Sequence, residues 1–148
     1  MGLFSSLRIS ASALGAQRLR MDVVANNVAN VNSTRGPDGG PYRRQSVVFR
    51  EQQQGPAFRD LLGVAQDRTR GAGVEVTQIH RDTSPARRVH DPSHPDADAD
   101  GYVLLPNIDV VTEMTDLVGA SRAYEASVTV LNATKSLAQS ALNIGRRG

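Results

Sequence analysis

Two stretches of this chain, one near each end, carry apolar residues at alternating spacings of four and three residues. The first series consists of Leu3, Leu7, Ser10, Leu14, Gln17, Met21, Val24, Val28 and Val31. The second series consists of Val110, Met114, Leu117, Ser121, Tyr124, Val128, Leu131, Lys135, Ala138 and Leu142. This spacing is typical of the contact seam of a coiled coil. A stripe this narrow is not buried by its own helix, so each helix needs a partner.

The predicted amino-terminal helix runs from about Leu3 to Val31 and ends in a region rich in asparagine. Several serines and Gly15 lower its helix propensity, so we expect it to be ordered only against a partner. The asparagines all lie outside the seam, and they are Asn26, Asn27, Asn30 and Asn32. We expect them to line the sides and back of the helix. There they can bond exposed carbonyl groups or reach a neighbouring chain.

The middle of the chain predicts short strands joined by long loops. Turn residues from Arg35 to Pro41 end the first helix. Four stretches with strand character follow, at residues 42–50, 74–79, 87–90 and 102–105. Residues 51–70 match no pattern. A second helix begins near Asn107 or Asp109, because either side chain can cap a helix that follows Pro106.

These elements predict an α+β fold, in which long amino- and carboxyl-terminal α-helices form a coiled-coil-like pair that flanks a small β-rich central module. The expected divisions are residues 1–34 (helix with an Asn-rich end), 35–105 (β-rich module with long loops) and 106–148 (second helix). A length of 148 residues suits one ordinary domain. Because only 39% of the residues are hydrophobic and 4% are aromatic, we expect a thin core.

Charge and composition exclude several classes of protein. The net charge of +2, from 17 basic and 15 acidic residues with no basic block, gives no reason to expect nucleic acid as a partner. The absence of cysteine excludes disulfides, thiolate metal sites and cysteine nucleophiles. No apolar run approaches the ~18 residues of a membrane span, so we expect no membrane-embedded segment. Arg8 interrupts the first apolar stretch, which argues against a cleaved secretory signal.

One acidic stretch matches the first half of a calcium-binding loop. Residues 96–101 (DADADG) place Asp96, Asp98 and Asp100 at the spacing of an EF-hand. The second half is missing, because Asn107 stands where the bidentate Glu belongs and Pro95 replaces the end of the incoming helix. Two readings stay open, a calcium site or an acidic turn between two strands, and the turn is the simpler one.

No other group of residues supports catalysis. His90 and His94 have a spacing that suits zinc on a helix, but Pro92 between them breaks a regular helix and no third ligand is evident. The chain contains neither a nucleophile elbow nor a phosphate-binding glycine loop. We therefore predict a protein that is not an enzyme, with no cofactor and no small-molecule substrate.

Several motifs together resemble the bacterial flagellar axial proteins of the rod and hook family. The motifs are residues 25–34 (ANNVANVNST), 42–45 (YRRQ), 91–98 (DPSHPDAD), 101–103 (GYV), 106–107 (PN), 111–114 (VTEM), 120–126 (ASRAYEA) and 131–135 (LNATK). The asparagine signature alone is typical of the whole family. The insertion of residues 35–41 before the aromatic Tyr42 is similar to that of a proximal-rod member. The resemblance covers both ends and the late middle of the chain.

This resemblance implies a structural subunit of the proximal rod of the flagellar basal body, which assembles into a helical tube and transmits torque. It implies contacts with copies of itself, with other rod proteins and with the flagellar type III export apparatus. It also implies a location in the rod within the periplasmic space, reached without a cleaved signal peptide. The alternative is a soluble coiled-coil adaptor or a calcium-responsive binding module.

The residues expected at subunit interfaces belong to the two seams and to the Asn-rich helix end. They are Leu7, Leu14, Met21, Val24, Asn26, Asn27, Val28, Asn30, Val31, Met114, Leu117, Tyr124, Val128, Leu131 and Leu142.

Overall fold

The computed structural model describes residues 3–36, 39–52, 71 and 73–145. Its elements follow in the order α1 (Leu3–Ala29), β1 (Gln45–Glu51), β2 (Val74–Arg81), β3 (Arg87–His90), β4 (Tyr102–Leu105) and α3 (Val110–Gly145). The predicted α+β class, with two long helices flanking a small antiparallel β module, is confirmed. Most of residues 51–70, which match no pattern of secondary structure, lies outside the described residues.

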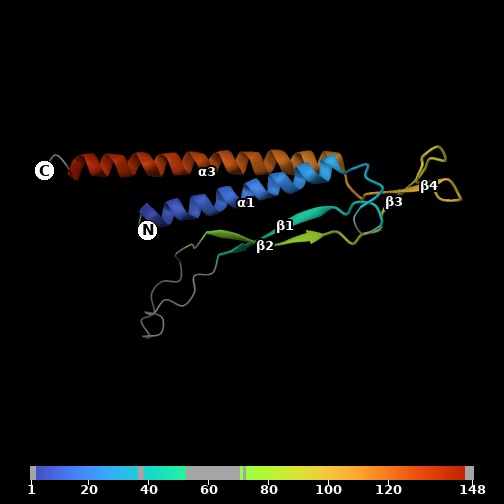
Figure 1. Cartoon of the computed structure of the whole chain (residues 1–148). Helices are drawn as coiled ribbons and strands as arrows, with labels where there is room; N and C mark the ends of the chain where they lie inside the picture. The colour runs from blue at the N-terminus through green and yellow to red at the C-terminus, as the bar shows by residue number, and fades with distance from the viewer. Residues whose placement is uncertain (1–2, 37–38, 53–70, 72, 146–148) are drawn as a thin grey trace, which may run out of the picture.

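Helix α1 lies between α3 on one side and the β1–β2 ribbon on the other, as Figure 1 shows. The two helices are antiparallel, because the late residue Asn27 of α1 bonds the early residue Glu113 of α3 while Arg20 bonds Asp116. Helix α3, with 36 residues against 27 in α1, extends past the amino terminus of α1 (Figure 1). Each of the two terminal helices therefore packs on the other one within the same chain.

The ends of both helices follow from side chains that bond the backbone. At the end of α1, Asn30 donates from Nδ2 to the carbonyl oxygen of Asn26 at 2.9 Å, as expected for an asparagine at a helix end. At the start of α3, Asp109 Oδ1 accepts from the Val111 amide at 3.2 Å and Oδ2 accepts from the Thr112 hydroxyl at 2.6 Å. Asp109 is thus the cap, one of the two residues predicted for that role.

The four predicted strands are present, and they form two separate antiparallel ribbons. In the first ribbon Gln45 pairs with Arg81 and Glu51 with Val74, with a bulge between Val48 and Phe49. The first strand begins at Gln45 and not at Tyr42, because the Tyr42 amide bonds the Ser33 carbonyl oxygen at 3.0 Å instead of a strand partner. The second ribbon, β3–β4, projects from the far end of the molecule (Figure 1).

The buried apolar core is small, as the composition predicted. Its members are Ala16, Val23, Val24, Val103, Ile108 and Ala120. None is larger than isoleucine, and two of the six are alanines, Ala16 of α1 and Ala120 of α3. Long-range polar contacts also join the elements, and several of them meet at the junction described below.

The first two positions of the predicted α3 seam, Val110 and Met114, are exposed in the single chain and do not pack on α1. Met114 is 58% exposed and Val110 also faces solvent, whereas Glu113, one position before Met114, is fully buried. Further along, Leu117, Tyr124, Val128 and Leu131 are half-buried on the face that Glu113 and Ala120 share by helical spacing. The stripe by which α3 packs on α1 thus begins at Glu113, one residue before the heptad position Met114. An α-helix has 3.6 residues per turn, so its contact stripe need not keep a strict heptad spacing.

Candidate functional site

The most elaborate cluster in the described residues is a buried polar junction where the end of α1, the start of β1 and the start of α3 meet. We define this polar junction as Asn27, Tyr42, Arg44, Gln45 and Glu113. Asn27 and Glu113 have no exposed surface, and they are the two largest fully buried side chains described. Burying two such polar groups is costly unless their hydrogen bonds are made.

Both the nitrogen and the oxygen of the Asn27 side-chain amide form hydrogen bonds. Its Nδ2 donates to the Gln45 carbonyl oxygen at 2.8 Å and to Glu113 Oε2 at 2.9 Å. Its Oδ1 accepts from the Gln45 amide at 2.9 Å and from the Tyr42 hydroxyl at 3.0 Å. The Asn27 side chain continues the ladder of β1 like a short strand, because it both donates to and accepts from the backbone of Gln45. Aspartate has no donor for two of these bonds.

The buried carboxylate of Glu113 is paired with a cation. Arg44 Nε donates to Glu113 Oε1 at 2.6 Å, and the Arg44 guanidinium also lies 3.6 Å from Asp116. Asp116 in turn pairs with Arg20 of α1 at 2.9 Å. Charges of alternating sign thus run from the buried Glu113 to the half-exposed Arg20. This arrangement offsets the cost of burying the Glu113 charge.

The pKa of the Tyr42 phenol reflects its partial burial in the polar junction. Burial raises the pKa of the Tyr42 phenol above its ordinary value, and the negative charge of Glu113 raises it further. The neutral phenol is therefore the form that the folded chain favours, and it is the form that donates to Asn27.

The predicted position of Asn27 was wrong. We expected it on the sides or back of the helix, but it is buried because α1 packs against both α3 and the β1–β2 ribbon. Glu113 and Arg44 were not predicted as site residues at all. The only sequence signal for them was their place inside two motifs of the resemblance, residues 42–45 and 111–114.

A second contact ties the acidic loop to the segment after α1. Thr34 donates from its hydroxyl to Asp96 Oδ2 at 2.6 Å, and Arg35 Nε donates to Asp96 Oδ1 at 2.7 Å. The hydrogen bond from Thr34, followed by that from Arg35, holds the pKa of the Asp96 carboxyl below its usual value. The loop is thus fixed to the chain that leads into β1.

Asp98 has a different set of partners from Asp96. Its Oδ1 accepts from the amides of Asp100 and Tyr102 at 3.0 and 2.8 Å, which closes the turn before β4. Within the described residues no group of three or more His, Asp or Glu side chains comes together in a way that suits a metal ion. The geometry therefore favours the reading of residues 96–101 as an acidic turn.

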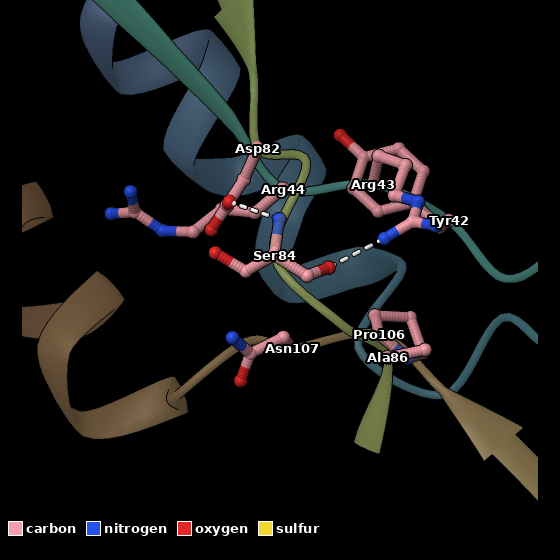
Figure 2. A pocket seen from close by; sticks show the side chains of 8 residues that line it. All are labelled: Tyr42, Arg43, Arg44, Asp82, Ser84, Ala86, Pro106 and Asn107. Carbon is pink, nitrogen blue, oxygen red and sulfur yellow. Dashed lines mark hydrogen bonds between the residues drawn. The ribbon is translucent and has the colours of Figure 1, made fainter. Parts of the chain in front are cut away.

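A small cavity lies where the ends of the two ribbons approach the start of α3 (Figure 2). It is lined by Tyr42, Arg43, Arg44, Asp82, Ser84, Ala86, Pro106 and Asn107. Arg43 donates to the Ser84 carbonyl oxygen at 2.6 Å, and the Ser84 amide donates to Asp82 at 2.8 Å. The volume of about 10 Å³ has room for about one water molecule and is far below that of a substrate pocket.

The predicted interface residues occupy different environments. Val24 is buried inside the molecule, whereas Asn26, Met114 and Leu142 are exposed. The others are half-buried, apart from Asn27, and they are Leu7, Leu14, Met21, Val28, Asn30, Val31, Leu117, Tyr124, Val128 and Leu131. As contacts between subunits they stay predictions. Across the part of the chain described, neither helix is long and apolar enough to cross a membrane.

Two protein families match this chain. Residues 7–37 match the family described as "Flagella basal body rod protein", and residues 99–144 match "Flagellar basal body rod FlgEFG protein C-terminal". Asn27 lies in the first match and Glu113 in the second, so the Asn27–Glu113 contact joins the two matched regions.

Curated relatives match over nearly the whole chain. The flagellar basal-body rod protein FlgC of Borreliella burgdorferi is 49% identical over 97% of this chain and 98% of its own length. The proteins of the same name from Bacillus subtilis and Salmonella typhimurium are 46% and 40% identical, each over 99% of this chain and 100% of their own length.

Proposed function

Because the chain belongs to the family of flagellar basal-body rod proteins named FlgC, and is thus a structural subunit of the rod, we propose that the outer face of α3 forms its contacts with neighbouring subunits. We define this outer face as Val111, Met114 and Val118. These side chains are 72%, 58% and 52% exposed, and their spacing places them on one side of the helix. That side points away from the face of Glu113 and Ala120, which contacts α1. An apolar stripe of this kind marks an interaction surface.

We further propose that such contacts build the helical tube of the proximal rod and transmit torque. Contacts between unlike surfaces of identical or related subunits repeat without closing, which generates a tube. The polar junction supports this role, because it fixes α1, α3 and the β1–β2 ribbon as one unit. Load applied to one helix then passes to the others without bending a loop. The partners in this proposal are copies of the chain and other rod proteins.

The proposal includes export by the flagellar type III apparatus into the periplasmic space without a cleaved signal. The support is that α1 is part of the fold from Leu3 onward and carries the buried residues Ala16, Val23 and Val24. Mass spectrometry of the chain from purified basal bodies should recover a peptide that contains Phe4 and Ser5. A mature chain that begins well inside α1 would contradict this part of the proposal.

The contact proposal is tested by comparing aspartate at two neighbouring positions of α3. Met114→Asp places a charge on the outer face, so we expect an unchanged free energy of unfolding, non-swimming cells and no complete rods by electron microscopy. Leu117→Asp is the matched inner control, because Leu117 is half-buried on the face toward α1. It should lower the free energy of unfolding as well as motility. Normal swimming with Met114→Asp would refute the outer face as an interface.

A further inference from the structure

A second cavity, larger than the one in Figure 2, lies between α1 and β1. Its volume is about 200 Å³. It is lined by four apolar residues (Val23 and Val24 of α1, Val47 and Phe49 of β1) and by the polar or charged Arg20, Arg44, Gln45, Ser46 and Asp116. An engineered apolar cavity of about 150 Å³ in another protein accepts benzene, so this one has room for a single aromatic ring. Ile79, the cross-strand partner of Val47, is 45% exposed, which shows that this end of the ribbon is incompletely covered.

The rim of this cavity is charged. Arg20 and Asp116 form an ion pair across it at 2.9 Å, and both side chains remain about one-third exposed. The Arg20 guanidinium beside the apolar side chains of the cavity favours an aromatic occupant, because a guanidinium can lie against the face of an aromatic ring.

The same chain presents a matching aromatic side chain elsewhere. Phe4, in the first turn of α1, is 84% exposed, more than any other large apolar side chain in the described residues. It precedes Arg20 and Val24 by 16 and 20 residues of continuous helix, which is roughly 24–30 Å at 1.5 Å per residue. A straight helix cannot fold back over that distance, so Phe4 does not reach the cavity of its own molecule.

We propose that the cavity receives the Phe4 ring of a second copy of this chain. The inference rests on the proposed function, and it names one contact between copies. The ring and the cavity lie on different parts of the surface, so one contact between two copies leaves one ring and one cavity unused. Repeated head-to-tail, as the proposed rod requires, the contact propagates along an open row of subunits.

The direct test replaces Phe4 with the photo-reactive aromatic p-benzoylphenylalanine in cells that lack the native copy. Basal bodies are isolated, irradiated and digested, and the cross-linked peptides are sequenced. We expect cross-linked dimers and larger multimers in which residue 4 joins residues 20–24 or 44–49 of another copy. The same amino acid at Ala11, an exposed position two turns further along α1, should give at least ten-fold less of this product.

The outcomes separate this inference from the proposed function. Native chain absent from purified basal bodies would refute the rod role itself. Native chain present in them, with the residue-4 probe linked to a different protein or to another face, or with no cross-link, would overturn only the Phe4 contact.

Filling the cavity is a second test that leaves Phe4 intact. Val47→Trp places a large ring where the foreign ring would lie, so we expect at least a ten-fold loss of the chain from basal bodies. Val48→Trp is the matched control, because Val48 is exposed and does not line the cavity. Purified Val47→Trp chain should keep the wild-type circular dichroism spectrum. Normal incorporation of Val47→Trp would overturn the inference.

Discussion

The amide of Asn27 makes four hydrogen bonds to groups from three segments, and each bond has a partner of the right kind. Two go to the backbone of Gln45, one to Tyr42 and one to Glu113. A side chain with this many tertiary partners defines the relative positions of α1, β1 and α3. It also leaves several buried groups unsatisfied when it is removed.

We expect Asn27→Ala to lower the free energy of unfolding by at least ~3 kcal/mol, because each buried partner left without a hydrogen bond costs about 1–3 kcal/mol. Urea unfolding followed by circular dichroism measures this change. Asn26→Ala is the matched control, since Asn26 is exposed and its side chain bonds only Asn30 among the contacts described. If the two variants were equally stable, the polar junction would not hold the fold together.

Tyr42 makes the stability depend on pH at the alkaline end. Its pKa is raised in the folded chain, so above pH ~10 the unfolded chain ionises first and the free energy of unfolding falls. Below that pH both states are neutral and this contribution is fully present. We expect wild type to lose more stability than Tyr42→Phe between pH 9 and about 11. Parallel losses in urea titrations of the two proteins would show that Tyr42 is not the group responsible.

At the scale of elements, most of the fold could be predicted because local chemistry fixes it. Pro106 followed by Asp109 determines where α3 begins, and the asparagine cluster marks the end of α1. Two of the strands were predicted with the bounds they have, β3 and β4. The burial of Asn27 could not be predicted, because it depends on the ribbon that packs on the second side of α1. The burial of Glu113 could not be predicted, because it depends on Asn27 and Arg44, which lie far from it in the sequence.

The turn between β3 and β4 depends on a glycine. Gly101 has a φ of +77°, and a Cβ there would lie 3.0 Å from Pro92 Cγ and 3.2 Å from His90 Nε2. The glycine of the calcium-like motif therefore serves the turn itself.

We expect Gly101→Ala to destabilise the β3–β4 ribbon by ~1–2 kcal/mol, because a side chain in left-handed backbone costs about that much. Faster hydrogen exchange of the β3 and β4 amides, measured by NMR or mass spectrometry, would report it. Gly40→Ala is the control, because a Cβ at Gly40 meets no atom within 4 Å. Unchanged exchange in Gly101→Ala would mean that the turn tolerates a side chain.

At the scale of the whole molecule, the packing of α3 on α1 includes a small buried residue, Ala120. Ala120 has no exposed surface, whereas a Cβ added at its neighbour Gly119 would meet no other part of the structure within 4 Å. Substitutions at these two adjacent positions therefore separate the effect of packing on stability from the effect of helix propensity.

We expect Ala120→Leu to cost about 1–3 kcal/mol, because overpacking forces the helices apart. Gly119→Ala should instead stabilise the chain by ~0.5–1 kcal/mol, because alanine favours a helix interior over glycine. Thermal and urea unfolding of the two variants measure both changes. A stabilising Ala120→Leu would show that the helices are loosely packed.

The function was predicted from the resemblance of the sequence motifs to a protein family, and not from any catalytic or binding site. The motif at residues 25–34 contains Asn27 and the motif at residues 111–114 contains Glu113. Nothing in either motif indicates that the two side chains form a hydrogen bond. The cavity beside Val47 was also beyond prediction. It depends on how a ribbon and a helix meet, and no local pattern encodes that angle.

The bond between Asn27 and Glu113 joins residues 86 positions apart. A ribosome makes the chain from its amino end, so α1 exists for most of synthesis without the helix that completes it. The Asn27–Glu113 bond therefore cannot form until the last quarter of the chain has been made. The packing of α3 on α1 is then a late, long-range step, and long-range contacts form more slowly than either helix does.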